Sequence, residues 1–362
     1  MKNTQLPEKE QRFPRILVAA LDWGLGHASR CIPIIDELRR QGAEVFLAAS
    51  GAAAGLWKLT YPGLPLFALP AYGIRYRWAN MYLNMLANAP QMAWAVVAEH
   101  IRLRRLVRQY NIDIVISDNR LGCFHPGIRS IYMTHQLHIQ APEPVGRWLI
   151  NAFHRVVIRQ YDECWVPDAA GEDNLAGALS HPPVHPATTY IGHLSRLVRP
   201  AIPLAFDIVA VLSGPEPQRS RLEAEILRQL ADIAVPSLLI RGAPHARALR
   251  EVPGHIEVWN FASGEQIAAA LAGARLIVCR SGYSTLMDLA AMGRPALLIP
   301  TPGQTEQVYL AGYYKNKNFG VVQQQGRLQL DRALREIENC SSPELALCAT
   351  PFYSYVCSNV QR

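Results

Sequence analysis

Little in this 362-residue sequence points to stabilisation by disulfides or by structural zinc. Its seven cysteines are odd in number, and no two of them form a C-x-x-C pair. Unclustered cysteines of this kind are typical of a protein from a reducing compartment. We therefore expect reduced thiols and a cytoplasmic location, not a secreted and cross-linked fold.

The sequence also lacks an uninterrupted apolar run of about 18 residues, the length that a bilayer-spanning helix needs. The nearest approach, residues 78–98, is broken by asparagine, proline and glutamine residues. Residues 1–14 are polar and have no apolar centre like that of a signal peptide, so we expect a disordered lead-in there. These absences predict a protein that does not span a membrane.

Acidic residues are in deficit, which leaves a formal net charge of +7. Residues 1–200 hold 21 Lys and Arg against 15 Asp and Glu, whereas residues 201–362 hold 15 against 14. The basic excess in the N-terminal half suits an anionic substrate or an acidic membrane surface. No RNA-binding signature or basic tail accompanies it, so we expect no nucleic-acid partner.

What the sequence does contain is two series of apolar, strand-like segments alternating with helix-length segments. The first series lies at residues 15–21, 44–49, 112–117, 130–134 and 163–166, and the second at 207–212, 237–241, 256–258, 276–278 and 296–299. This alternation predicts parallel sheets with helices on both faces. We expect two Rossmann-like, doubly wound α/β domains at residues 15–193 and 207–340, with a linker at 194–206 and a tail at 341–362.

The most informative stretch, residues 276–300, is predicted to form a strand, a turn, a helix and a second strand. Arg280, Ser281 and Gly282 form the turn, and Gly293 followed by Arg294-Pro295 ends the helix. A helix that begins at the carboxyl end of a strand offers free backbone N–H groups and a positive dipole end to a phosphate.

The helix that follows this turn carries Ser284, Thr285 and Asp288, which fall on roughly the same face as Ser281. One interpretation is a site for a nucleoside diphosphate, in which Asp288 accepts hydrogen bonds from ribose hydroxyls. The other is an ordinary N-capped helix of an α/β protein.

Residues 279–295, together with the segment from Ile299 to Gln307, resemble the donor-binding signature of glycosyltransferase family 28. The resemblance is specific over about residues 255–325. That family, which includes the N-acetylglucosaminyltransferase of peptidoglycan assembly, has the GT-B fold, in which two Rossmann-like domains face a cleft. The resemblance implies that Ser281 and Gly282 approach the diphosphate, that Asp288 holds the ribose where the family usually has Glu, and that Gln307 reaches the sugar hydroxyls.

Two loops of the second domain add to the predicted donor site. The loop from Ser213 to Arg219 contains prolines where the peptidoglycan enzyme has a glycine-rich loop, which argues against assuming the peptidoglycan reaction itself. Phe261 is a candidate wall for the nucleotide base. The full predicted donor side comprises Ser213, Gly214, Arg219, Phe261, Arg280, Ser281, Gly282, Ser284, Thr285, Asp288, Gln304 and Gln307.

A glycine-containing turn, residues 22–30, follows the first strand. Gly24 and Gly26 alone make a weak dinucleotide motif, because Ser29 replaces the third glycine. In GT-B enzymes this loop faces the cleft, and a histidine there often acts as the base. The resemblance thus implies that His27 deprotonates the acceptor hydroxyl. The alternative is that His27 caps the helix or contacts phosphate.

Asp118 and Asn119 stand at the carboxyl end of the strand at 112–117. Plant-type glycosyltransferases of the GT-B fold use an aspartate in this region to orient the base, so Asp118 is the candidate partner of His27. The alternative is an Asx-turn after a strand. Gly26, Asn119 and His135 complete the predicted acceptor side.

Arginines lie beside apolar and aromatic residues at 72–86, and a basic cluster at 102–108 closes a helix predicted over 91–110. Such mixtures suit anionic lipid headgroups, and the resembled family meets the membrane through its N-terminal domain to reach a lipid-linked acceptor. The alternative is a domain core with a solvated basic face. The sequence has no Asp-x-Asp motif, with which other glycosyltransferases hold manganese, so we expect no essential metal and no cofactor besides the UDP-sugar substrate.

These patterns together predict an inverting, metal-independent glycosyltransferase. It would transfer a hexose or N-acetylhexosamine from a UDP-sugar to a glycan, lipid-linked or cell-envelope acceptor, at the inner face of the cell membrane. Two alternatives stay open: a GT-B nucleotide-sugar epimerase or hydrolase, and a non-catalytic protein that binds nucleotide sugars.

Overall fold

The computed structural model describes residues 12–73, 81–141, 143–201, 203, 205–243, 246–249 and 251–343, and for residues 81–87 only the backbone. Most of the predicted lead-in and tail, and residues 74–80 of the stretch predicted to contact lipid, lie outside the described residues.

A seven-stranded parallel sheet forms the N-terminal domain, in the order β3-β2-β1-β4-β5-β6-β7. Its strands are β1 (Arg15–Ala20), β2 (Glu44–Ala49), β3 (Leu66–Ala68), β4 (Ile114–Asp118), β5 (Arg129–Met133), β6 (Glu163–Val166) and β7 (Thr188–Tyr190). The helices between them are α1 (Leu25–Arg40), α2 (Gly51–Thr60), α3 (Met81–Tyr110), α4 (Pro144–Ile158) and the short η1 (Gly177–Leu179).

A six-stranded parallel sheet, in the order β10-β9-β8-β11-β12-β13, forms the C-terminal domain. Its strands are β8 (Ile208–Val211), β9 (Ser237–Ile240), β10 (Ile256–Trp259), β11 (Leu276–Cys279), β12 (Ala296–Leu298) and β13 (Gly320–Val322). The helices are α5 (Gln218–Ile233), α6 (Gly264–Gly273), α7 (Tyr283–Met292), α8 (Thr305–Asn316), α9 (Leu330–Glu336) and η2 (Ile337–Asn339).

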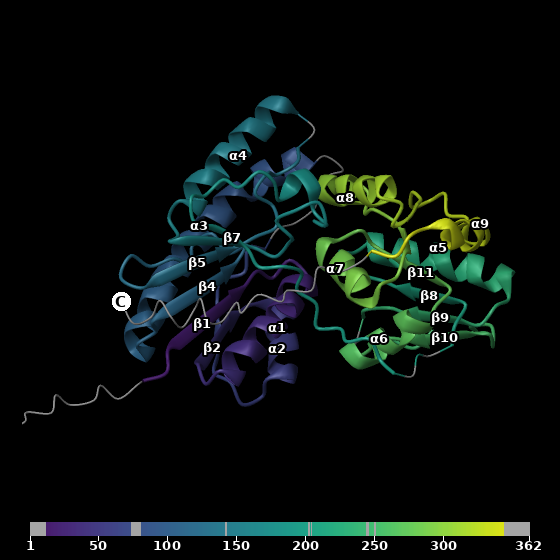
Figure 1. Cartoon of the computed structure of the whole chain (residues 1–362), viewed down its shortest axis with the longest axis horizontal. Helices are drawn as coiled ribbons and strands as arrows, with labels where there is room; N and C mark the ends of the chain where they lie inside the picture. Colours follow the sequence, from purple (N-terminus) through teal and green to yellow (C-terminus); the bar gives the residue numbers. More distant parts are fainter. Residues whose placement is uncertain are drawn as a thin grey trace, which may run out of the picture.

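Helices cover both faces of each sheet, as the near-continuous apolar strands predict. In the first sheet, β1, β2 and β4 pack on α1 and α2 through one face and on α3 through the other. The cluster around Tyr132 and Ile158 joins α4 to the same face as α3. In the second sheet, α6, α7 and α8 lie on one face and α5 and α9 on the other. The prediction of two doubly wound α/β domains is confirmed (Figure 1).

Two helices begin earlier than the sequence predicts. We expected a turn through residue 30, but α1 begins at Leu25, because Gly24, four residues after the end of β1, adopts the positive φ of 78° that reverses the chain. The helix expected from Gln91 begins at Met81 and continues through Pro90. Proline costs one backbone hydrogen bond there, and the helix continues past it.

The two domains meet at the starts of α1 and α7 (Figure 1). One apolar cluster runs without a break from Ala28 on α1 through Leu194 and Leu197 of the linker to Met287 on α7. The Tyr283 hydroxyl donates to the Pro167 carbonyl across the same junction, at 2.7 Å. The carboxyl ends of the two sheets therefore face each other. Within the described part of the chain, no helix is long and apolar enough to cross a bilayer.

Candidate active site

Strand order explains how α1 reaches the end of β4. β1 and β4 are neighbours in the sheet, and Ala20 is paired with Asp118 at their carboxyl ends. Because α1 begins five residues after β1 ends, its first turns pass directly over Asp118. Side chains from two segments some 90 residues apart in sequence thus converge at one edge of the sheet.

His27 and Asp118 form the contact that was predicted for them. His27 Nδ1 lies 3.2 Å from Asp118 Oδ2. The Asp118 side chain is fully buried, whereas His27 retains a 15% exposed side chain. Burial would raise the pKa of Asp118, but Arg30 and His27 outweigh that effect and hold the pKa well below its usual range. Asp118 is therefore a carboxylate that can orient and stabilise a protonated imidazole.

Sequence reasoning missed Arg30, which is the other partner of Asp118. Its Nε donates to Oδ2 at 2.9 Å, and its Nη2 donates to Oδ1. Arg30 lies about one turn after His27 on α1 and is buried. The signal that could have found it is the spacing of three between His27 and Arg30, which puts both on one helix face.

His135, predicted on the acceptor side, instead bridges the two domains. Its Nδ1 lies 3.1 Å from Arg30 Nη1, and its Nε2 lies 3.0 Å from Glu306 Oε1, on α8 of the C-terminal domain. Its ring stacks on Tyr283 with 4.1 Å between centroids and 4° between planes. Burial lowers the pKa of His135, which favours the neutral ring.

The starts of α1 and α7 are both suited to an anion. Their N-cap residues, Gly24 and Gly282, make no side-chain cap, and neither first turn contains an acidic residue. The two helix starts also approach each other closely. There is no room for a Cβ on Gly26, since it would overlap the Ser284 hydroxyl. Two positive helix ends thus lie against each other where the domains meet.

Ser281, the predicted diphosphate contact, is buried and donates through its hydroxyl to the Gln307 backbone carbonyl at 2.8 Å. The Gln307 side-chain oxygen accepts from the Thr301 N–H at 2.8 Å, and its amide donates to Gln304 at 2.5 Å. The turn before α7 and the loop before α8 therefore form one unit. The Gln307 and Gln304 side chains hold that loop in shape.

Two arginines that were predicted on the donor side form hydrogen bonds or ion pairs within the C-terminal domain. Arg280 is buried, and its guanidinium donates to the carbonyls of Ile299, Pro300 and Gln218 and to Gln325, so it fastens loops inside the domain. Burial lowers its pKa to about 10.

Arg219 is likewise occupied. It forms ion pairs with Glu216 and Glu223. In this structure, the guanidinium N–H groups of both arginines are thus engaged within the C-terminal domain.

Asp288, the predicted ribose contact, lies on α7, two turns after Ser281. Its Oδ1 accepts from the Ser195 hydroxyl at 2.6 Å, so in this structure it is bonded to the interdomain linker. Burial raises the pKa of Asp288 to about 6. A ribose would have to take the place of Ser195 at this carboxylate.

The remaining predicted residues surround the same edge. Ser213 and Gly214 are exposed after β8, and Gly214 faces Thr301. Phe261, the predicted wall for the nucleotide base, is 44% exposed. Thr285 is half-buried on α7.

Asn119, predicted on the acceptor side, adopts φ 55°, in the left-handed region. Its side-chain oxygen accepts from the Tyr132 hydroxyl at 3.2 Å, so Asn119 belongs to the turn after β4. Among the described residues, no three His, Cys, Asp or Glu side chains gather as metal ligands would.

The sequence and the fold both resemble known glycosyltransferases. Residues 247–350 match the family model described as the glycosyltransferase family 28 C-terminal domain. The chain is 24% identical over 368 residues to the UDP-N-acetylglucosamine–N-acetylmuramyl-(pentapeptide) pyrophosphoryl-undecaprenol N-acetylglucosamine transferase of Acidithiobacillus ferrooxidans, with 92% of this chain and 90% of the relative covered.

Solved structures share the fold at lower identity. The glycosyltransferase SnogD from Streptomyces nogalater superposes with a TM-score of 0.62 at 18% identity, over 92% of this chain and 97% of that one. MurG of Acinetobacter baumannii superposes with a TM-score of 0.55 at 15% identity, over 91% and 96%. Both likenesses extend over two domains, which confirms the GT-B fold. The chain is a glycosyltransferase whose second domain carries the family 28 signature.

Proposed function

We propose that this protein transfers a sugar from a UDP-sugar to a lipid-linked or other cell-envelope glycan acceptor, with inversion at the anomeric carbon and without a metal ion. The observation that carries the proposal is the pairing across the domain junction. A histidine held by a buried carboxylate, His27 with Asp118, stands opposite the uncapped start of α7 at Gly282. Base and leaving-group site thus belong to different domains.

In the proposed reaction, His27 Nε2 takes the proton of the acceptor hydroxyl as its oxygen attacks the anomeric carbon. The bond between that carbon and the diphosphate oxygen breaks, and the diphosphate keeps the electron pair. Asp118 stabilises the imidazolium that forms. The backbone N–H groups at Gly282 and Tyr283, with the dipole of α7, stabilise the leaving diphosphate, the task that a metal performs in other transferases.

The donor is proposed to be a UDP-sugar because the named relative uses UDP-N-acetylglucosamine. Asp288 would accept from the ribose hydroxyls in exchange for the Ser195 hydroxyl that it binds here. Phe261 would cover the base. N-acetylglucosamine is the first sugar to test.

Thermal unfolding with UDP, ADP, GDP and NAD tests the donor site directly. A ligand at 100 times its dissociation constant adds about 2.7 kcal/mol, enough to raise Tm by several degrees. We expect a shift with UDP that the Asp288→Ala variant largely loses, and a smaller or no shift with the other nucleotides.

Asp331→Ala, an exposed aspartate on α9, is the control and should respond to UDP like the wild type. A shift with NAD alone would rule out the donor assignment. Incubation with UDP-N-acetylglucosamine and no acceptor then separates the alternatives, since stoichiometric UDP release would favour a hydrolase and a changed sugar an epimerase.

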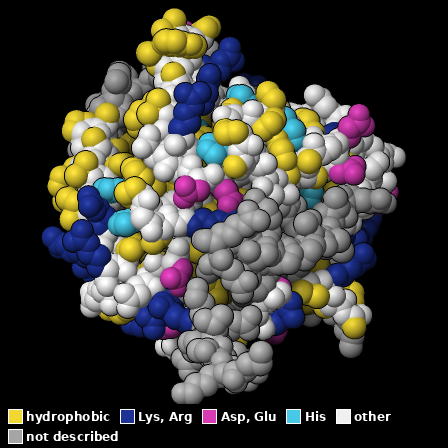
Figure 2. Space-filling model, turned by 60° about the vertical axis from the view of Figure 1, so that its left-hand side comes forward, with side chains coloured by type: hydrophobic (Ala, Val, Ile, Leu, Met, Phe, Trp, Pro, Cys, Tyr) yellow, Lys and Arg dark blue, Asp and Glu magenta, His cyan; other side chains and the backbone are white. Residues whose placement is uncertain are grey.

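We further propose that the protein acts in the cytoplasm, at the inner face of the membrane, through the layer that α3 and α4 form. α4 packs inward through Asn151, His154 and Ile158. Its opposite face is exposed and apolar: Val145, Trp148, Leu149, Phe153 and Val156. Figure 2 shows these hydrophobic side chains in yellow at the top of the molecule, with basic side chains in dark blue beside them. An exposed apolar stripe next to arginines is typical of an interfacial helix.

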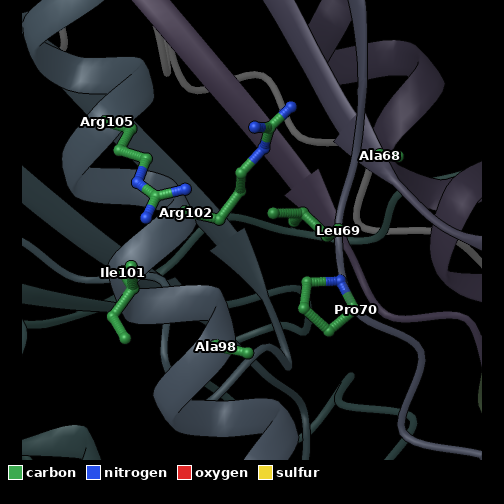
Figure 3. Close-up of a pocket in the computed structure, with 7 residues that line it drawn as sticks. All are labelled: Ala68, Leu69, Pro70, Ala98, Ile101, Arg102 and Arg105. Carbon is green, nitrogen blue, oxygen red and sulfur yellow. The ribbon is translucent and has the colours of Figure 1, made fainter.

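α3 adds apolar and basic side chains to the same layer. Trp94, Val97 and Ile101 are exposed on it, spaced three and four residues apart. Beside them, Arg102 and Arg105 line a groove of about 450 Å³ with Leu69 and Pro70 (Figure 3). Guanidinium groups above an apolar floor suit the phosphate and upper chain of an anionic lipid. This basic cluster was predicted from the sequence; the exposed face of α4 was not.

Replacing Trp148 and Phe153 together with aspartate is expected to weaken binding to vesicles rich in phosphatidylglycerol by at least about tenfold, because two apolar side chains leave the interface and two negative charges enter it. Sedimentation with vesicles measures this. Val198→Asp, at an exposed apolar position on the linker, should bind like the wild type. Equal binding by all three proteins would contradict the assignment of α4.

A further inference from the structure

His27 Nδ1 has two neighbours that compete for it. Asp118 Oδ2 lies at 3.2 Å and Arg30 Nη2 at 3.1 Å. A carboxylate only accepts hydrogen bonds and a guanidinium only donates them. One ring nitrogen can therefore satisfy only one of the two at a time.

The outcome of this competition decides what His27 can do. If Nδ1 carries the proton and donates to Asp118, then Nε2 has a free lone pair and can act as a base. If Nδ1 accepts from Arg30, then Nε2 carries the proton, and a neutral His27 cannot accept another there. Asp118 therefore selects the active tautomer of His27, and Arg30 selects the inactive one.

The other terminal nitrogen of Arg30, Nη1, has an acceptor that competes with His27 for the guanidinium. Arg30 Nη1 lies 3.1 Å from His135 Nδ1. Since the guanidinium can only donate, His135 Nδ1 must be the acceptor, and a neutral His135 then carries its proton on Nε2. That proton points at Glu306 Oε1, 3.0 Å away. Glu306 thus fixes the tautomer of His135, although it lies on the other domain.

We propose that Glu306 is a positioning residue for the base: by holding His135 in the Nε2–H tautomer, it gives Arg30 an acceptor away from His27 and leaves Asp118 as the partner of His27 Nδ1. Without Glu306, His135 can turn its proton to Nδ1, where it opposes the Arg30 N–H. Arg30 then turns to the next acceptor within reach, His27 Nδ1. The inference rests on the proposed role of His27 as the base.

Other groups around this chain of contacts agree with it. The Cys31 thiol lies 3.5 Å from Asp118 Oδ2, and Tyr283 stacks on His135. Burial raises the pKa of both, so both stay neutral at neutral pH. Tyr283, like Glu306, belongs to the C-terminal domain. The contacts of Glu306 and Tyr283 with His135 therefore form only when the domains meet. His27 then becomes able to act as the base.

The test compares Glu306→Leu, which removes the acceptor, with Glu306→Gln, which keeps an oxygen for the His135 N–H. The Glu306 side chain is 34% exposed, so neither replacement disturbs a packed core and both variants should fold. With UDP bound, ¹⁵N NMR of the imidazoles reports the tautomer of His27. We expect the Nε2–H form of His27 to rise in Glu306→Leu and to stay near the wild-type level in Glu306→Gln.

Kinetics give the second readout, with UDP-N-acetylglucosamine as donor and a polyprenyl diphosphate-linked sugar in micelles as acceptor. Glu306→Leu should lower kcat about tenfold with KM for the donor within about twofold, because a minority of molecules then hold an active base. Glu306→Gln should recover most of kcat. Glu265→Leu, an exposed glutamate on α6, is the matched control and should match the wild type.

His135→Asn places a side-chain oxygen near the position of Nδ1 without a link to Glu306. In that background, Glu306→Leu should have no further effect on kcat. A raised KM with unchanged kcat in Glu306→Leu, or an unchanged tautomer of His27, would overturn the inference, because Glu306 would then serve the sugar alone. Failure of the proposed function looks different: kcat would survive His27→Ala.

Discussion

Replacing His27 with alanine is expected to lower kcat about a thousandfold, because a positioned general base contributes roughly 10² to 10⁴ in rate. UDP affinity should change by less than about twofold, since the predicted nucleotide contacts all come from the C-terminal domain. Asp118→Asn should lower kcat by a similar factor, since its amide N–H can stabilise the wrong tautomer of His27. Steady-state kinetics and UDP titration measure both effects.

His185→Ala provides the matched histidine control, because His185 lies in the loop before β7 and caps the Ala187 N–H. It should retain wild-type kcat. If His27→Ala also keeps kcat within about threefold of the wild type, His27 does not act as a general base, and its contact with Asp118 is structural.

The largest loss of stability is expected from Arg120→Met. Arg120 and Glu99 form a fully buried ion pair at the carboxyl edge of the first sheet, and Arg120 also donates to the Ala20 and Pro70 carbonyls. Burial raises the pKa of Glu99 although Arg120 and Tyr72 oppose the shift. Without Arg120, the Glu99 carboxyl group keeps its hydrogen bonds from Tyr72 and Gly122 but loses its counter-charge, and the two carbonyls lose a donor. We expect the free energy of unfolding of the N-terminal domain to fall by about 3–5 kcal/mol.

Calorimetry or urea unfolding measures this loss. Arg108→Met, an exposed arginine on α3, should stay within about 0.5 kcal/mol of the wild type. Replacing Glu99 with methionine as well should recover part of the loss, because no buried carboxyl group then lacks a counter-charge. A loss below about 1 kcal/mol in Arg120→Met would show that water or a moved loop replaces the arginine.

The sequence predicts most of the fold because buried parallel strands are continuous apolar runs, and such runs are conspicuous. The strand that became β4 was expected to carry Asp118 at its carboxyl end, and it does. The helix that became α7 was expected to end at Gly293, which adopts φ 60° there. Both predictions rest on local chemistry that the chain carries within a few residues.

The unpredicted part of the site depends on contacts between distant segments. Glu306 meets His135 only because two domains dock, and the separation of 171 residues leaves no trace in local sequence. Arg30 was expected at the end of a turn, whereas it lies on α1, which begins earlier than the sequence predicts. Arg280 and Arg219 were expected on the donor side, yet Arg280 binds carbonyls and Arg219 binds carboxylates of the same domain, contacts that the sequence pattern does not show.

The close contact of Gly26 with Ser284 has a consequence for how fast and how tightly ligands exchange. If the diphosphate binds at the start of α7, as proposed, we expect the domains to separate first, because α1 covers that helix start here, and separation breaks the Tyr283 hydrogen bond to Pro167. The apparent dissociation constant for UDP is then the intrinsic constant divided by the fraction of molecules that are open. A chain that is open for about one hundredth of the time binds UDP about a hundredfold more weakly than its open form alone.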